Sequence, residues 1–179
     1  MKTWIALFRG INVGGNNKLP MKELASLLEG LGLSGVCTYI QSGNVVFRSA
    51  RGTAEKWSGE IRRAVEVRFG FSPWVLVMEA TALRKIATAN PFPHAEADHK
   101  TLHLFFTAAP PDGADRAGLD ALKSPTETWA IVGPVFYLHA PEGIGRSRLA
   151  ARAERLLGVE ATARNWRTVR EVLALAELP

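Results

Sequence analysis

The sequence predicts a mixed α+β protein made of two ferredoxin-like halves of the βαββαβ type, the second incomplete, packed as one compact unit. Three observations carry this prediction. The first half alternates short apolar runs with amphipathic segments in the order βαββαβ. The second half repeats most of that order, which indicates a duplication. The composition, 47% hydrophobic and 22% charged over 179 residues, is that of an ordinary globular protein.

The first half, residues 1–80, is expected to form one subdomain. Residues 3–9 read TWIALFR, an aliphatic and aromatic run typical of a buried strand. Pro20 suits the first turn of a helix, and leucines at helical spacing continue this helix to Gly30. The elements expected after it are a strand over 36–40, a strand from 45, a helix over 53–69 and a strand over 74–78.

The second half, residues 81–179, is expected to form the other subdomain. A helix over 81–89 ends before two prolines, and residues 102–107 form a strand. Two apolar runs flank Gly133 and Pro134 and so predict a hairpin. The remaining expected elements are helices over 113–123, 146–157 and 165–177. The last strand of a βαββαβ unit is missing from this prediction.

Composition excludes several protein classes. The chain has one cysteine, Cys37, and therefore no intrachain disulfide. No apolar run approaches the ~18 residues of a membrane helix, and the N-terminal run is too short for a signal peptide, so we expect a cytoplasmic protein. The net charge is +5, and seven arginines but two glutamates lie between Arg146 and Arg170. This charge favours an anionic ligand or nucleic acid as partner, although many basic proteins bind neither.

The loop after the first strand, FRGINVGGNNKLP, resembles a phosphate-binding loop but matches none. Gly10 and Gly15 have P-loop spacing, yet Asn16 and Asn17 replace the required lysine and hydroxyl residue, and no dinucleotide fingerprint is present. Successive backbone N–H groups before a helix can still bind an anion. The alternative is that Gly and Asn serve only a tight turn. The candidate ligand-binding residues here are Arg9, Asn12, Gly14, Gly15, Asn16, Asn17 and Lys18.

A second polar stretch, YIQSGNVVFRS, runs from Tyr39 to Ser49. Its Gln41, Ser42 and Asn44 are candidate ligand-binding residues, and the alternative is a plain hairpin turn. Alignment with the RNA-recognition motif places Asn44 and Val46 where base-stacking aromatics are needed, which argues against that mode of binding. Ser42 is not in a G-x-S-x-G nucleophile elbow either.

Two further stretches near the C-terminus are basic at helix starts. Arg146 and Ser147 follow two glycines at the start of a helix, and Arg164 and Asn165 precede another, where Asn165 can act as the cap. These four residues complete the candidate set. For the first of these stretches the alternative is a solvated helix face, since Arg148, Arg152 and Arg155 recur at helical spacing opposite a leucine stripe. For the second, the alternative is a structural role for Trp166.

Catalytic and metal chemistry have little support in the sequence. Three histidines and two carboxylates gather between His94 and His103, but their spacing fits no metal motif and two prolines lie just before them. Cys37 falls in an expected strand, and no acid–base pair of carboxylates can be identified. We therefore expect no metal and no cofactor.

Several motifs occur in order along nearly the whole chain. They are ALFRGINVGGNNKLPM, TYIQSGNVVF, FGF before an apolar strand, ANPF, GRS before a basic residue and leucine, and TARNWRTV. Together they resemble the bacterial family called domain of unknown function 1697. The resemblance implies an α+β fold of ferredoxin-like halves and brings no established activity, substrate or catalytic residue.

Three functions fit these observations. The first is a binding module for a phosphate-bearing ligand, a nucleotide or nucleic acid, through the Gly, Asn and Arg-rich loops. The second is an enzyme on a small anionic substrate, which lacks an evident base or nucleophile. The third is a structural or protein-interaction domain in which the polar residues only tie the two halves together. The oligomeric state is left open by the sequence.

Overall fold

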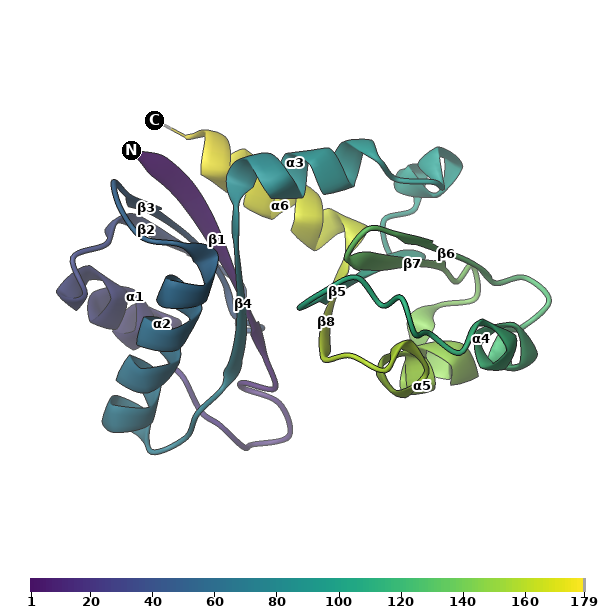
Figure 1. Ribbon diagram of the computed structural model, residues 1–179, viewed down its shortest axis with the longest axis horizontal. Helices are drawn as coiled ribbons and strands as arrows, with labels where there is room; N and C mark the ends of the chain where they lie inside the picture. Colours follow the sequence, from purple (N-terminus) through teal and green to yellow (C-terminus); the bar gives the residue numbers. More distant parts are fainter. Residues whose placement is uncertain (179) are drawn as a thin grey trace. The chain divides into compact units, whose positions relative to one another are not determined.

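Two four-stranded antiparallel sheets form the framework of the computed structural model, which describes residues 1–178 (Figure 1). The first sheet has the strand order β2-β3-β1-β4. Its elements are β1 (Lys2–Arg9), α1 (Met21–Gly30), β2 (Ser34–Tyr39), β3 (Asn44–Ser49), α2 (Ala54–Phe69) and β4 (Trp74–Glu79). The βαββαβ order and the central β1 confirm the predicted ferredoxin-like first half.

The central strand β1 carries the core of this half. Side chains alternate across a strand, so Trp4, Ala6 and Phe8 share one face, and α1 and α2 cover it (Figure 1). The helices contribute Leu24, Leu28, Ile61 and Val65 to the same core. Thr53 caps α2 by accepting a hydrogen bond from the backbone of Lys56 at 3.2 Å. Gly70 ends α2 in the left-handed conformation, as its position after the apolar stripe predicted.

The second sheet repeats this topology with the order β6-β7-β5-β8. Its elements are β5 (Leu102–Thr107), α4 (Arg116–Leu122), β6 (Thr128–Val132), β7 (Val135–His139), α5 (Arg148–Leu157) and β8 (Ala161–Asn165). The predicted α+β class is confirmed. The prediction that the second half is incomplete is wrong, because β8 pairs antiparallel with β5 and completes a second βαββαβ unit.

Strand β8 was not predicted from the sequence because its residues, ATARN, are small or polar. Its pairing with β5 over His103–Thr107 places Ala161 and Thr162 in the interior all the same. The Arg164 guanidinium donates hydrogen bonds from Nη1 to Thr162 Oγ1 and to the Ala163 carbonyl, both at 2.8 Å. Tertiary pairing thus overrides the weak strand propensity of this segment.

Two helices and two 3₁₀ turns lie outside the sheets' βαββαβ frames. They are α3 (Ala80–Thr88), α6 (Trp166–Glu177) and 3₁₀ turns over Pro93–Ala97 and Ile144–Arg146. The chain divides into two compact units. The first unit comprises Met1–Lys85 and the segment that begins at Arg170, and the second comprises Ile86–Val169. The division at residue 80 and the packing of the halves as one unit stay predictions.

None of the described helices is a candidate membrane span. Within residues 1–178, no helix combines the length and the apolar character needed to cross a bilayer.

Gly43 provides a sharp test of packing at the β2–β3 turn. Its φ is +78°, and a Cβ there would lie 2.6 Å from both Phe8 Cβ and Ile11 Cδ1. We expect Gly43→Ala to lower the free energy of unfolding by about 3 kcal/mol, from left-handed strain plus overpacking. Gly15→Ala, with φ +81° but no atom within 4 Å, isolates the strain and should cost only about 1 kcal/mol. Equal losses in urea unfolding would contradict the packing argument.

Candidate functional site

The loop between β1 and α1 folds back on itself as a miniature hairpin. Val13 and Asn16 form an isolated antiparallel bridge, and the Asn12 N–H donates to the Asn17 carbonyl at 3.1 Å. The left-handed residues of this loop are Gly10, Asn12, Gly14, Gly15 and Asn17, with φ between +50° and +81°. Glycine and asparagine tolerate this conformation best. The backbone path therefore accounts for most of the Gly and Asn content.

Asn12 is the main cross-link of the loop. Its Nδ2 donates to the carbonyls of Leu19 and Gln41, each at 2.9 Å, and its Oδ1 accepts the Leu19 N–H at 2.8 Å. The bond to Gln41 joins the loop to the β2–β3 turn. Asn17 Nδ2 donates to the Gly10 carbonyl at 3.0 Å and closes the base of the loop. Both side chains thus have structural partners.

The β2–β3 turn is held by Asn44. This side chain is fully buried, and its Nδ2 donates to the Tyr39 carbonyl at 3.0 Å and to Ser42 Oγ at 3.2 Å. The Phe8 N–H donates to the Gly43 carbonyl at 2.8 Å, so the turn is also tied to β1. The predicted loop and turn therefore do meet. Of the candidate residues on them, Arg9 and Asn12 are half-buried and Asn44 is buried, whereas the others are exposed, namely Gly14, Gly15, Asn16, Asn17, Lys18, Gln41 and Ser42.

Arg146 and Ser147 lie in the second unit, at a hollow of about 290 Å³ beside the N-terminus of α5. Ser147 caps the helix by accepting the Ala150 N–H at 2.9 Å. This cap starts α5 at Arg148, two residues later than predicted. The hollow is lined by residues 121–125, 127, 142, 143 and 146–148. The C-terminal end of α4 and the loop before α5 thus form its walls.

Positive side chains outnumber negative ones in the lining of this hollow. Its cations are Lys123, Arg146 and Arg148, and its carboxylates are Glu127 and Glu142, which leaves one positive charge in excess. Glu127 accepts the Ser124 N–H at 2.8 Å, and Glu142 accepts the Thr126 hydroxyl at 3.0 Å. Lys123 also lies 3.7 Å from Asp120. The structure shows no ion pair for Arg146 or Arg148 among residues 1–178.

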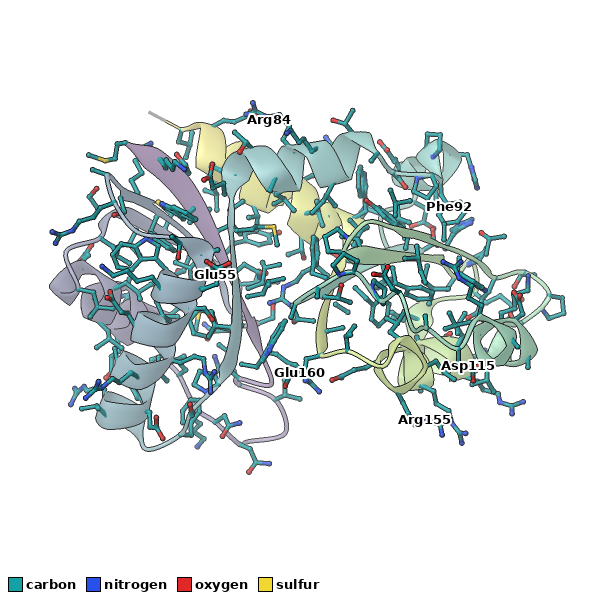
Figure 2. The ribbon with its side chains drawn as sticks, viewed as in Figure 1. Glu55, Arg84, Phe92, Asp115, Arg155 and Glu160 are labelled. Atoms are coloured by element: carbon teal, nitrogen blue, oxygen red, sulfur yellow. The ribbon has the colours of Figure 1, made fainter. Side chains whose placement is uncertain are left out.

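Further arginines follow the hollow along α5. Arg148, Arg152 and Arg155 are exposed, as the helical spacing predicted, and Figure 2 shows Arg155 directed away from the ribbon. The opposite side of α5 buries Leu149, Ala153, Leu156 and Leu157. The basic row thus starts at the hollow and continues along the solvent face of the helix.

Arg164 and Asn165 have structural partners at the end of β8. Arg164 is 8% exposed, and burial lowers the pKa of its guanidinium to about 10, so the group stays charged at neutral pH. Asn165 Oδ1 accepts the Thr168 N–H at 2.9 Å and caps α6, as predicted. Neither residue lines the hollow at α5.

The histidines occupy two separate places in the second unit. His94 and His139 approach edge to face, with ring centroids 5.2 Å apart, and both rings lie next to Phe92. His103 lies in β5, and burial lowers its pKa to about 4. Among residues 1–178, no three His, Cys, Asp or Glu side chains are grouped so that they could hold a metal ion.

Comparison with known proteins decides the family. Residues 1–137 match the family described as "Protein of unknown function (DUF1697)". The chain belongs to the DUF1697 family. The matched region includes the loop of Asn12 and the turn of Asn44, whereas Arg146 and the rest of α5 follow it in the sequence.

A solved structure shares the fold of the DUF1697 chain. It is described as the structure of conserved bacterial protein SP0830 from Streptococcus pneumoniae, at 22% sequence identity and a TM-score of 0.70. The similarity covers 98% of this chain and 99% of that one, and at this identity it shows the fold alone. No curated protein matches the chain.

One feature of the hollow was missed by sequence analysis. Lys123, at the C-terminal cap of α4, faces the same hollow as Arg146 although 23 positions separate them. No motif connects the two positions, so no sequence signal predicts their meeting. Only the packing of α4 beside α5 brings them together.

The hydrogen bonds of Asn12 in the DUF1697 chain can be tested by substitution. Asn12→Asp replaces the donor to two carbonyls by an acceptor, so at neutral pH we expect a loss of about 2 kcal/mol in unfolding free energy. Facing carbonyls raise the pKa of the introduced carboxyl above its unfolded value of about 3.9. The loss should therefore shrink as pH falls towards that value and the group protonates. Asn16→Asp, exposed in the same loop, is the matched control, and equal losses for both variants would contradict the cross-link.

The burial of His103 predicts that the second unit loses stability as the pH falls. Its pKa falls from 6.5 to about 4 on folding, mainly because the ring is buried. Between these pH values the unfolded chain binds a proton that the folded chain does not, so the stabilising contribution is complete above pH 6.5 and is lost as pH falls towards 4. We expect His103→Gln to flatten this part of the stability profile in urea unfolding. An unchanged slope would contradict the assignment.

Proposed function

We propose that this protein is a binding module for a phosphate-bearing ligand, a nucleotide or nucleic acid, which it holds at the hollow beside α5. The observation that carries the proposal is the pair Arg146 and Arg148 on either side of the capping Ser147. Arginine pairs with phosphate through two parallel N–H donors, and the positive end of the helix dipole adds to the attraction.

The size of the hollow supports a phosphate group rather than a whole cofactor. Its volume of about 290 Å³ lies at the lower end of small-molecule sites, which span ~300–1,000 Å³. A ligand would thus place its phosphate and adjoining sugar there and leave the rest outside. A single-stranded nucleic acid meets this condition, since only one nucleotide needs to enter.

The arginine row on α5 favours nucleic acid over a free nucleotide. From Arg148 to Arg155 the helix rises by roughly 10 Å, and Arg152 lies between them on the exposed face. Successive phosphates of one strand can therefore follow the row away from the hollow. The net charge of +5 adds a long-range attraction to any polyanion.

The equivalent place in the first unit lacks this charge. A hollow of about 440 Å³ lies at the N-terminus of α2, but Lys2 and Lys85 there are balanced by Glu55 and Glu79. The exposed loop around Gly15 and Lys18 offers backbone donors and one cation, and we include it as a weaker anion-binding surface.

A structural or protein-interaction role is the second candidate. It is favoured by the buried Asn44 and by Asn12, whose polar groups bind backbone atoms instead of facing a cavity. An enzyme on a small anion, the second candidate from the sequence, now ranks third, because the carboxylates at the hollow, Glu127 and Glu142, are both hydrogen-bonded to neighbouring protein groups.

Binding can be measured by fluorescence anisotropy with labelled single-stranded and duplex oligonucleotides at low and at physiological salt. We expect affinity to fall with salt, with a log–log slope of about −0.7 for each phosphate contacted on a single strand. The double variant Arg146→Ala/Arg148→Ala should flatten this slope by about 1 and weaken binding uniformly across sequences. Nucleotides and inorganic phosphate, titrated in the same way, test the smaller ligands.

The matched control is the double variant Arg51→Ala/Arg62→Ala, which removes the same charge from exposed positions of the first unit that line neither the hollow at α5 nor the surface between α1 and α2. It should reduce affinity less than the α5 variant does. Equal effects would show a non-specific charge attraction, and absence of binding at low salt would exclude the proposal.

A further inference from the structure

An apolar groove of about 540 Å³ lies on the outer side of the helical layer of the first unit, between α1 and α2. Leu27 of α1, Leu31 at its C-cap, and Ala64 and Val67 of α2 form its apolar surface. The other lining residues, Glu60, Arg63 and Arg68, are charged. The groove is unrelated to the hollow at α5 and carries no role in the proposed ligand binding.

Val67 is the most exposed apolar residue of this groove. Its side chain is 81% exposed, whereas the buried stripe of α2 consists of Trp57, Ile61 and Val65. A β-branched residue on the solvent side of a helix loses side-chain freedom and gains no burial. Single exposed apolar residues are common, but here Leu27, Leu31 and Ala64 adjoin Val67 in one concave surface. Such a surface is typical of an interaction site.

The charges of the groove are self-complementary. Glu60, Ala64 and Arg68 follow one another at four-residue spacing and so lie on one stripe of α2. If a second copy packs its α2 antiparallel across Ala64, a two-fold axis brings Glu60 opposite Arg68 of the second copy, and the reverse pair forms by symmetry. The small side chain of Ala64 allows the two helices to approach closely at the crossing.

The present partners of these charges do not oppose such pairing. Lys56 Nζ lies 3.6 Å from Glu60 Oε1, and Arg68 Nη2 lies 3.5 Å from Glu23 Oε2. In both pairs every side chain is at least 42% exposed. Exposed pairs of this kind contribute little to stability. Their side chains are free to turn towards a second copy and to join an ion-pair network across the interface.

We propose that the groove between α1 and α2 is a homodimer interface in which two copies of this chain pack around a two-fold axis near Ala64. Val67 and the two leucines supply the apolar contact, and the Glu60–Arg68 pairs set the antiparallel register. The interface is isologous, so it closes at two copies and does not propagate into a fibre.

The oligomeric state of the full chain, measured by sedimentation equilibrium over a dilution series, tests the interface. The wild-type protein should approach twice the chain mass of 19.5 kDa as concentration rises. Val67→Glu should raise the dimer dissociation constant at least about tenfold, because it replaces the central apolar contact by a carboxylate that must lose its water on association. Val13→Glu, at a valine that is 66% exposed outside the groove, should leave the constant unchanged. Circular dichroism confirms that each variant is folded.

A charge-reversal cycle tests the proposed register. Glu60→Arg and Arg68→Glu each place like charges opposite one another, so each single variant should weaken the dimer. The double variant exchanges the signs and should restore dimerisation. A wild-type chain that stays monomeric at every concentration overturns the proposal. A double variant no better than the single variants overturns the register and the two-fold axis with it. Oligonucleotide binding is not involved in either readout.

Discussion

Burial of one central strand in each sheet is the constraint on which this structure depends. In β1 the residues from Trp4 to Phe8 are buried, and in β5 all six residues are. Each of these strands pairs with a neighbouring strand on both edges, so its backbone N–H and C=O groups find hydrogen-bond partners while its side chains are buried. The remaining strands and helices take their positions from these two.

The same constraint explains where the polar loops meet. Because β3 runs antiparallel to β1, with Leu7 opposite Asn44, the β2–β3 turn comes to the sheet end where β1 stops. The Gly and Asn loop leaves β1 at that end, and Asn12 bridges the short distance to the Gln41 carbonyl. Asn12, Asn17 and Asn44, which resemble part of a ligand-binding cluster in the sequence, thus hold the loop and the turn at one end of the sheet. The exposed backbone at Gly14 and Gly15 remains available to a ligand.

The two units share one topology but differ in surface chemistry. Both units place a hollow at the start of the helix that follows their third strand, α2 in one case and α5 in the other. Charges cancel at α2, whereas three cations and two carboxylates leave one positive charge in excess at α5. The solvent side of α2 is instead partly apolar around Val67. One topology thus carries an excess of positive charge at a helix start in one unit and an apolar helix face in the other.

The sequence by itself determined the elements whose side-chain period is strong. The apolar run of β1, the leucine stripe of α1 and the hairpin at Gly133 and Pro134 could be predicted, because burial of one face imposes a local pattern. Tertiary structure alone decided the rest. It made ATARN a strand by pairing it with β5, bonded Asn12 to the Gln41 carbonyl, and brought Lys123 beside Arg146. These features depend on contacts between distant segments, and such contacts leave no period in the chain.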